Sequence, residues 1–112
     1  MNCILCTLKK KEFDVTRNEY KYKNLIDKNV GNDKFRLRYY SINPKGQTRL
    51  ERHPATHTAF ILEGEGIVQG GKRKVRVSLG DAIVIPSNEL HQFKNTSDKP
   101  WVFLCATDYD SE

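Results

Sequence analysis

The three histidines of this 112-residue chain, His53, His57 and His91, all lie between residues 44 and 95. Two of them follow a glutamate in the run Glu51-Arg52-His53-Pro54-Ala55-Thr56-His57, and the third follows a second glycine-containing segment. Three imidazoles and one carboxylate form a ligand set that suits a divalent first-row transition metal ion. The residue types and their spacing therefore predict a metal site made of Glu51, His53, His57 and His91.

The role of Glu51 within this site is open to two interpretations. Its carboxylate can bind the metal ion directly, or it can accept a hydrogen bond from an imidazole and so orient that ring. Four protein ligands would leave one or two coordination positions open, which is typical of reactive rather than structural metal sites. Imidazole-rich ligation suits Fe, Mn, Ni, Zn or Cu, and the sequence does not choose among these ions.

The same residues resemble the two motifs of the cupin superfamily, G-x5-H-x-H-x3-E-x6-G and G-x5-P-x-G-x2-H-x3-N. The second motif is matched from Gly80 through Pro86 and His91 to Asn95. Its one departure is Asn88, which replaces the internal glycine. Asparagine tolerates a positive φ angle better than most residues, so we expect the backbone turn of the motif to be kept.

The first motif is similar as well, but two of its ligand positions are exchanged. His53 occupies the second histidine position, and Gly64 follows at the required spacing. Glu51 stands where the family usually has histidine, and His57 stands where it usually has glutamate. The inventory of three histidines and one glutamate is therefore kept. Lys45 replaces the leading glycine of the motif.

The resemblance implies an all-β fold, the double-stranded β-helix (jelly-roll) of a cupin barrel. A chain of 112 residues is large enough for one hydrophobic core. Its composition, 38% hydrophobic and 29% charged, favours a thin-walled β structure with a well-solvated exterior. We therefore expect a single cupin domain over residues 1–112, with a barrel core over about 34–106 and an N-terminal arm over 1–33.

A strand is predicted over residues 34–43, where it would place Arg38 and Tyr40 on the same face as Ile42. In cupin-like barrels the residue two positions before the turn proline usually points inward, which turns Tyr40 and Arg38 towards the cavity. A guanidinium there would suit bidentate binding of a carboxylate or phosphate. The opposite phase, with Arg38 in solvent, remains open because a β-bulge would reverse the alternation. Phe93 is also expected to point inward, so Arg38, Tyr40 and Phe93 are the candidate ligand-binding residues.

The charge balance restricts the partners that we expect. The net charge is +5, but the lysines and arginines are scattered along the chain, and no helix-turn-helix, RNP-like aromatic motif or Cys/His finger accompanies them. Nucleic acid is therefore not an expected partner, whereas a small anionic ligand is. No apolar run approaches the ~20 residues that a membrane-spanning helix needs. The N-terminus does not read as a signal peptide, so we expect a cytoplasmic protein with no membrane contact.

Two further features concern assembly and cysteine chemistry. The predicted last strand, residues 101–106, is apolar on both faces, which indicates a second sheet or subunit against it and predicts a homodimer. Cys3 and Cys6 have the spacing of a zinc or redox motif. A zinc site would need two further ligands, and a redox site would need a helix after the motif. Two ordinary thiols are the favoured interpretation, and the zinc alternative remains open.

Three classes of function fit this sequence. The first is a metalloenzyme that acts on a small anionic, oxygenated organic molecule as a dioxygenase, isomerase or lyase. The second is a non-catalytic metal-binding, ligand-binding or sensor module, and the third is a barrel that keeps its site without turnover. The resemblance makes each reaction possible and selects none, so whether the protein is an enzyme is left open.

Overall fold

The structure is a computed structural model, and it describes residues 9–109. The described part of the chain forms strands and one short 3₁₀ helix, η1. In chain order the elements are β1 (Val15–Thr16), β2 (Tyr20–Ile26), η1 (Lys28–Val30), β3 (Phe35–Ile42), β4 (His57–Glu63), β5 (Glu65–Gly70), β6 (Arg73–Ser78), β7 (Ala82–Ile85), β8 (His91–Lys94) and β9 (Trp101–Asp108). The predicted Cys3 and Cys6 motif lies outside the described residues.

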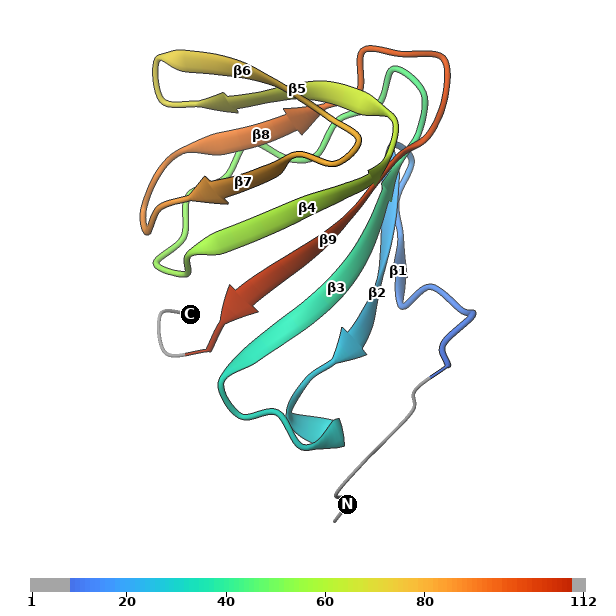
Figure 1. The fold of residues 1–112 in the computed structure, drawn as a ribbon, viewed down its shortest axis with the longest axis vertical. Coiled ribbons are helices and arrows are strands. Elements are labelled where there is room, and N and C mark those ends of the chain that lie inside the picture. The colour runs from blue at the N-terminus through green and yellow to red at the C-terminus, as the bar shows by residue number, and fades with distance from the viewer. Residues whose placement is uncertain (1–8, 110–112) are drawn as a thin grey trace.

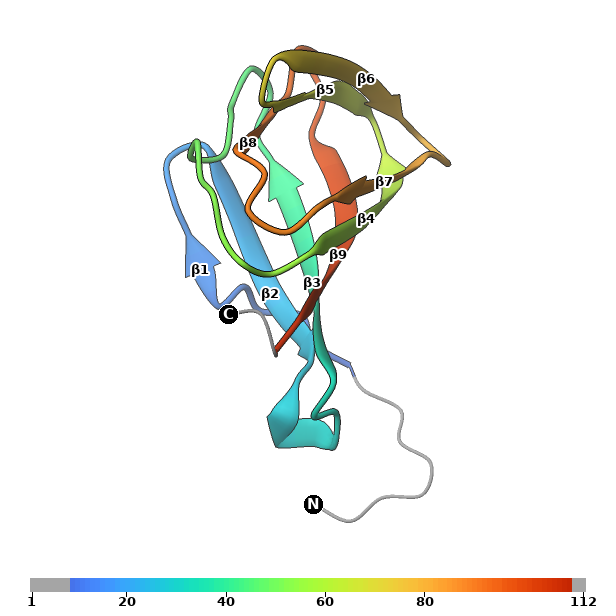
Figure 2. The same ribbon diagram turned by 90° about the vertical axis from the view of Figure 1, so that its left-hand side faces the viewer.

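The strands form two antiparallel sheets that curve towards each other around one interior (Figures 1 and 2). The larger sheet has six strands in the order β1-β2-β3-β9-β4-β7, and the smaller has three in the order β6-β5-β8. This arrangement confirms the prediction of an all-β jelly-roll. Among residues 9–109, no helix has the length and apolar character that crossing a membrane requires.

Strand β9 shows how side-chain alternation builds the interior. Its inward-facing residues are Trp101, Phe103, Cys105 and Thr107, and each of them is buried. The Phe103 ring stacks on Tyr40 of β3, with ring centroids 5.3 Å apart. Because successive side chains of a strand point to opposite faces, this series runs from large apolar groups at one end to polar groups at the other.

The polar end of the interior is assembled by strand pairing. Thr107 is opposite Arg36 of β3 and also opposite His57 of β4. Cys105 is opposite Arg38. Since directly opposite residues of an antiparallel pair project on the same face, these side chains share one region of the barrel. The register therefore brings one histidine and two arginines of distant sequence together.

Strand β2 belongs to the segment that precedes the predicted barrel core. It pairs antiparallel with β3, with Tyr22 opposite Tyr40 and Asn24 opposite Arg38. The inward face of the larger sheet therefore continues onto β2. As a result, residues before position 34 contribute to the barrel interior.

Two non-glycine residues at motif positions have a positive φ angle, a backbone conformation that is typical of glycine. Asn88 has φ 64° and Lys45 has φ 63°. Asn88 stands at the internal glycine of the second motif, and its tolerance of positive φ was the basis for expecting the turn to be kept. The left-handed conformation at Lys45 belongs to a tight turn in which the Gly46 N–H donates to the Asn43 carbonyl oxygen at 2.8 Å.

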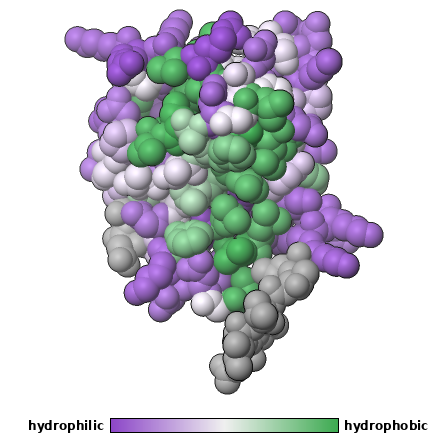
Figure 3. All heavy atoms as spheres, in the orientation of Figure 1, coloured by the Kyte–Doolittle hydropathy of each residue, from purple (hydrophilic) through white to green (hydrophobic). Residues whose placement is uncertain are grey.

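A band of hydrophobic side chains crosses the face of the larger sheet that is seen in Figure 3, between hydrophilic margins. Three large apolar side chains that alternation directs away from the interior are well exposed: Phe35 at 40%, Phe60 at 47% and Val84 at 59%. An apolar exterior of this kind usually marks an interaction surface.

Candidate metal centre

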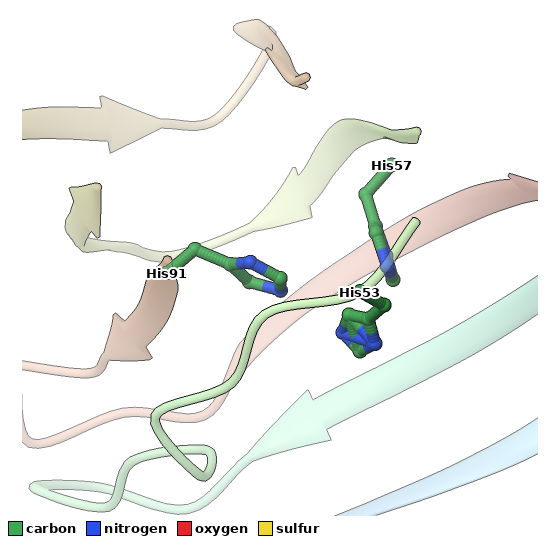
Figure 4. Close-up of side chains that lie close together, drawn as sticks. All are labelled: His53, His57 and His91. Carbon is green, nitrogen blue, oxygen red and sulfur yellow. The ribbon is translucent and has the colours of Figure 1, made fainter. Parts of the chain in front are cut away.

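The structure brings the three histidines together from three parts of the chain. His57 begins β4, His91 begins β8, and His53 lies in the connection between β3 and β4. Figure 4 shows the three rings converging, and their centroids are 4.6 to 5.0 Å apart. One ring nitrogen from each residue lies within 4.8 Å of the others, which is close enough for all three to bind one metal ion.

Backbone hydrogen bonds fix the connection that carries His53. Glu51 and His91 exchange two of them: the Glu51 N–H donates to the His91 carbonyl oxygen at 3.0 Å, and the His91 N–H donates back at 2.8 Å. The Asn88 N–H donates to the His53 carbonyl oxygen at 2.7 Å. The left-handed turn at Asn88 therefore holds a histidine of the first motif beside the histidine of the second.

The hydrogen bonds of the rings leave ring nitrogens available to a metal. The His91 Nδ1 lies 2.9 Å from the Glu89 carbonyl oxygen, which can only accept, so Nδ1 carries the proton and Nε2 keeps its lone pair. The Nε2 atoms of His53 and His57 are buried and make no hydrogen bond among the described residues; the Glu51 carboxylate, 3.4 Å from the His53 Nε2, lies close to it without the geometry of a hydrogen bond. Buried polar atoms are rarely left unpaired, and a cation would complete the site. The residues therefore fit a divalent metal ion.

Glu51 lies at the margin of this cluster. Its Oε2 is 3.4 Å from the His53 Nε2, and its Oε1 is 3.6 Å from the Arg49 Nε. It does not belong to the group of ligand atoms that all lie within 4.8 Å of one another, which is His53, His57 and His91. The carboxylate thus contacts one imidazole and one guanidinium.

An inner chamber of about 70 Å³ extends from the histidines into the barrel. Its lining includes the predicted ligand-binding residues Tyr40 and Phe93, together with Phe103. A single water needs roughly 10–15 Å³ of such space, so the inner chamber admits a group of only a few atoms. Since aromatic rings line much of it, that group would be shielded from bulk water.

An outer chamber of about 350 Å³ also adjoins His53 and His57 and shares part of its lining with the inner chamber. Arg38 lines it, so the structure places this guanidinium on the cavity side of β3, the phase that alternation from Ile42 indicated. The Arg38 Nε donates to the Asn24 Oδ1 at 2.8 Å. The outer chamber therefore combines a fixed guanidinium with two of the imidazoles.

Several lining residues were not identified from the sequence as candidates. They include Arg17, Tyr22, Arg36 and Thr107 of the outer chamber, Cys105 of the inner chamber, and Arg49, which lines both. Period-2 alternation carried a usable signal for Arg36, which shares a strand face with Arg38. Thr107 and Cys105 had no such signal, because their place in the site depends on how β9 pairs with β3 and β4.

The electrostatic environment keeps His57 neutral. Burial lowers its pKa from 6.5 to about 4, and positive charge on His91, His53, Arg36 and Arg38 acts in the same direction. A metal-binding imidazole has to be unprotonated, so this shift prepares His57 to serve as a ligand.

The lowered pKa of His57 predicts an acid-sensitive fold for the metal-free protein. Between pH 6.5 and about 4 the unfolded chain binds a proton at His57 that the native state does not, so stability falls as the pH falls through this window. Urea unfolding at several pH values checks this. The wild type should lose more stability across the window than a His57→Gln variant, whose side chain does not titrate, and parallel losses would contradict the assignment.

The sequence of this chain is similar to a known family of domains and to known proteins. Residues 38–107 match the Cupin_2 family model, described as a cupin domain. The chain is 34% identical over 76 residues to 1-methylthio-D-xylulose 5-phosphate methylsulfurylase of Rhodospirillum rubrum, which is 68% of this chain and 49% of that protein. The chain spans about half the length of the curated relatives that it matches.

Solved structures resemble the whole barrel. The polyketide cyclase RemF of Streptomyces resistomycificus is similar with a TM-score of 0.78 and 28% identity, over 87% of this chain and 72% of that one. A cupin-2 domain protein of Rhodospirillum rubrum is similar with a TM-score of 0.76 and 29% identity, over 95% of this chain and 70% of that one. These likenesses extend beyond the histidine cluster to the arrangement of both sheets.

Proposed function

Because this chain belongs to the cupin domain family, we propose that it binds one divalent transition metal ion through His53, His57 and His91 and holds a small anionic, oxygenated organic ligand beside it. The observation that carries the metal is the convergence of three ring nitrogens within 4.8 Å. The arginines that line the outer chamber favour a negatively charged ligand. One curated relative has a name that specifies a phosphorylated substrate, which agrees with an anionic ligand.

The ion, when bound, would act as a Lewis acid towards a ligand oxygen or, if it is redox-active, would allow oxygen chemistry. The residues of the chain supply the rest of the site. Glu89 holds His91 in the tautomer whose Nε2 is free, and Arg38 presents positive charge to the ligand. Phe93 and Phe103 limit the space and the water beside the ion. Glu51 contacts the His53 ring and remains our candidate for a fourth ligand or an orienting group.

A metalloenzyme is the reading we favour, because two of the similar proteins are named as a methylsulfurylase and a polyketide cyclase. Dioxygenase, isomerase and lyase reactions are the types that we propose to test. A non-catalytic metal- and ligand-binding module is the second candidate. Burial raises the pKa of Cys105 to about 11 and that of Tyr40 to about 12, so neither is a base at neutral pH. Glu51 is then the one carboxylate among the residues that line the two chambers.

Elemental analysis of protein purified without chelators and without a metal-binding tag tests this function. About one equivalent of Fe, Mn, Ni, Zn or Cu per chain is expected from a site with these ligands. Iron or copper would direct the search to oxygen-uptake assays, whereas zinc would direct it to isomerisation or elimination. Metal-free protein that also refuses added metal would overturn the proposal.

We also propose that a second copy of the chain covers the outer face of the larger sheet. Phe60 of β4 and Val84 of β7 lie on neighbouring strands of that face, 47% and 59% exposed. Burying apolar surface of this kind is the usual driving force for a symmetric dimer. Light scattering should read twice the 13.0 kDa mass of one chain, and a mass of one chain at micromolar concentration would refute the dimer.

A further inference from the structure

The outer chamber is strongly cationic for its size. Four arginines line it, whereas Glu51 is the one carboxylate among its lining residues. The arginines come from three segments: Arg17 precedes β2, Arg36 and Arg38 lie on β3, and Arg49 lies in the connection before β4. A single guanidinium can satisfy a planar carboxylate through two parallel hydrogen bonds. Four guanidinium groups around about 350 Å³ therefore suit a ligand group with more charge and more acceptor oxygens.

Arg38 is held in place by neutral partners. Its Nε donates to the Asn24 Oδ1 at 2.8 Å, and its Nη1 lies 3.5 Å from the Tyr40 hydroxyl oxygen. The guanidinium carbon lies 4.5 Å from the centre of the Tyr22 ring, which covers one face. A guanidinium carries five N–H donors, so these contacts fix its orientation and leave further donors for a ligand. Neither Asn24 nor Tyr22 neutralises its charge.

Two of the residues that orient this group, Tyr22 and Asn24, lie outside the part of the chain that matches the family model. The match covers residues 38–107, whereas Tyr22 and Asn24 belong to β2. Arg17 and Arg36 also precede the matched residues. The N-terminal part of this chain therefore supplies two of the four arginines of the outer chamber and two of the groups that hold Arg38, next to a metal centre built by the matched part.

We propose that the outer chamber binds the phosphate group of a small phosphate monoester at Arg38, and that Asn24 is the positioning residue that fixes Arg38 for this contact. The inference rests on the proposed function, which places the remainder of the same ligand at the histidines. A phosphate dianion directs three oxygens towards different sides, so it can accept hydrogen bonds from guanidinium groups on several segments at once. The outer chamber lies within the common range of ligand sites, about 300–1,000 Å³.

Calorimetric titration of the full chain with glycerol 3-phosphate, and separately with succinate, tests this assignment. The wild type should bind glycerol 3-phosphate more tightly than succinate. Arg38→Gln should lower the affinity for glycerol 3-phosphate by about tenfold or more, because it removes a charge-assisted hydrogen bond. Lys23→Gln is the matched control, since it also removes one positive charge. Lys23 lies on β2, donates to the Lys10 carbonyl oxygen and does not line the chamber.

Asn24→Leu tests the positioning role without changing the charge. Without Asn24 the Arg38 side chain loses its fixed orientation, so the affinity for glycerol 3-phosphate should fall by about two- to tenfold and its preference over succinate should shrink. The melting temperature and the metal content should stay at wild-type values. Two results would overturn the assignment: Lys23→Gln as damaging as Arg38→Gln, or succinate bound as tightly as the phosphate ester by the wild type.

The metal content of the same samples separates this inference from the proposed function. A wild type that retains metal but does not bind glycerol 3-phosphate overturns the phosphate assignment alone. A wild type that binds glycerol 3-phosphate but holds no metal, and takes up none when metal is added, supports the phosphate assignment and overturns the metal function. Among the variants, loss of glycerol 3-phosphate binding without loss of metal would also locate the phosphate group at Arg38 rather than at the histidines.

Discussion

Replacing His53 by alanine is expected to abolish the retention of a divalent metal ion while the barrel stays folded. His53 supplies one of the three converging ring nitrogens, yet it lies in a connection and its side chain is 31% exposed, so its removal leaves little void in the core. Loss of an outer-sphere partner of a metal ligand already costs about 10–100-fold in affinity. Loss of a ligand itself should therefore exceed about 100-fold.

Elemental analysis after dialysis, with the melting temperature of each sample, measures this effect. Arg52→Ala is the matched control, because it changes the exposed neighbour of His53 and should keep the metal. His91→Ala should lose the metal as well, but His91 is only 6% exposed and its replacement also opens a cavity, so some stability is lost. Unchanged metal content in both histidine variants would show that the metal, if any, is bound elsewhere.

The histidine cluster was predictable because its signal is chemical and local. His53 and His57 are four residues apart, and few other roles require imidazoles at that spacing together with a third one after Pro86. The turn at Asn88 was predictable for a similar reason, since asparagine at a glycine position indicates positive φ. Both features depend on residue type and short spacing, which a single sequence displays directly.

The composition of the chambers was less accessible, because it depends on which strands pair and in which register. Thr107 lies opposite Arg36 and His57, residues that are about half of the chain or more away from it in sequence. Nothing local to Thr107 indicates that it faces a metal centre. The contribution of β9 to the site is therefore a property of the closed barrel rather than of any one segment.

The place of β2 was obscured by its polarity. In the run Tyr20-Lys21-Tyr22-Lys23-Asn24 the tyrosines and Asn24 face the interior while the lysines face outward, but apolar residues are scarce, so the segment resembles a loop by composition. Its period of two was the signal that could have revealed it. The inward polar residues are tolerated because they line a chamber instead of a closed core, which is where the proposed ligand would lie.

The second large effect is expected at Asn95, the last residue of the second motif. Asn95 is 3% exposed, and its Nδ2 donates to the carbonyl oxygens of Ile42, Asn43 and Lys99 at 3.0, 3.1 and 2.7 Å. Its Oδ1 accepts from the Ser97 N–H and hydroxyl, both at 3.0 Å. One side chain thus joins the end of β3 to the turn before β9, so Asn95 serves the fold rather than the metal.

Asn95→Asp should lower the free energy of unfolding by about 3 kcal/mol or more, because it removes the amide donor and leaves a buried carboxylate facing three carbonyl oxygens. Asn88→Asp makes the same change at an exposed position and should cost less than about 0.5 kcal/mol. Urea unfolding at neutral pH measures both. Because the introduced carboxyl is buried, its pKa should be raised, and protonation would restore one donor. The difference between Asn95→Asp and wild type should therefore shrink in acid, whereas equal stability of the two aspartate variants at neutral pH would contradict the role assigned to Asn95.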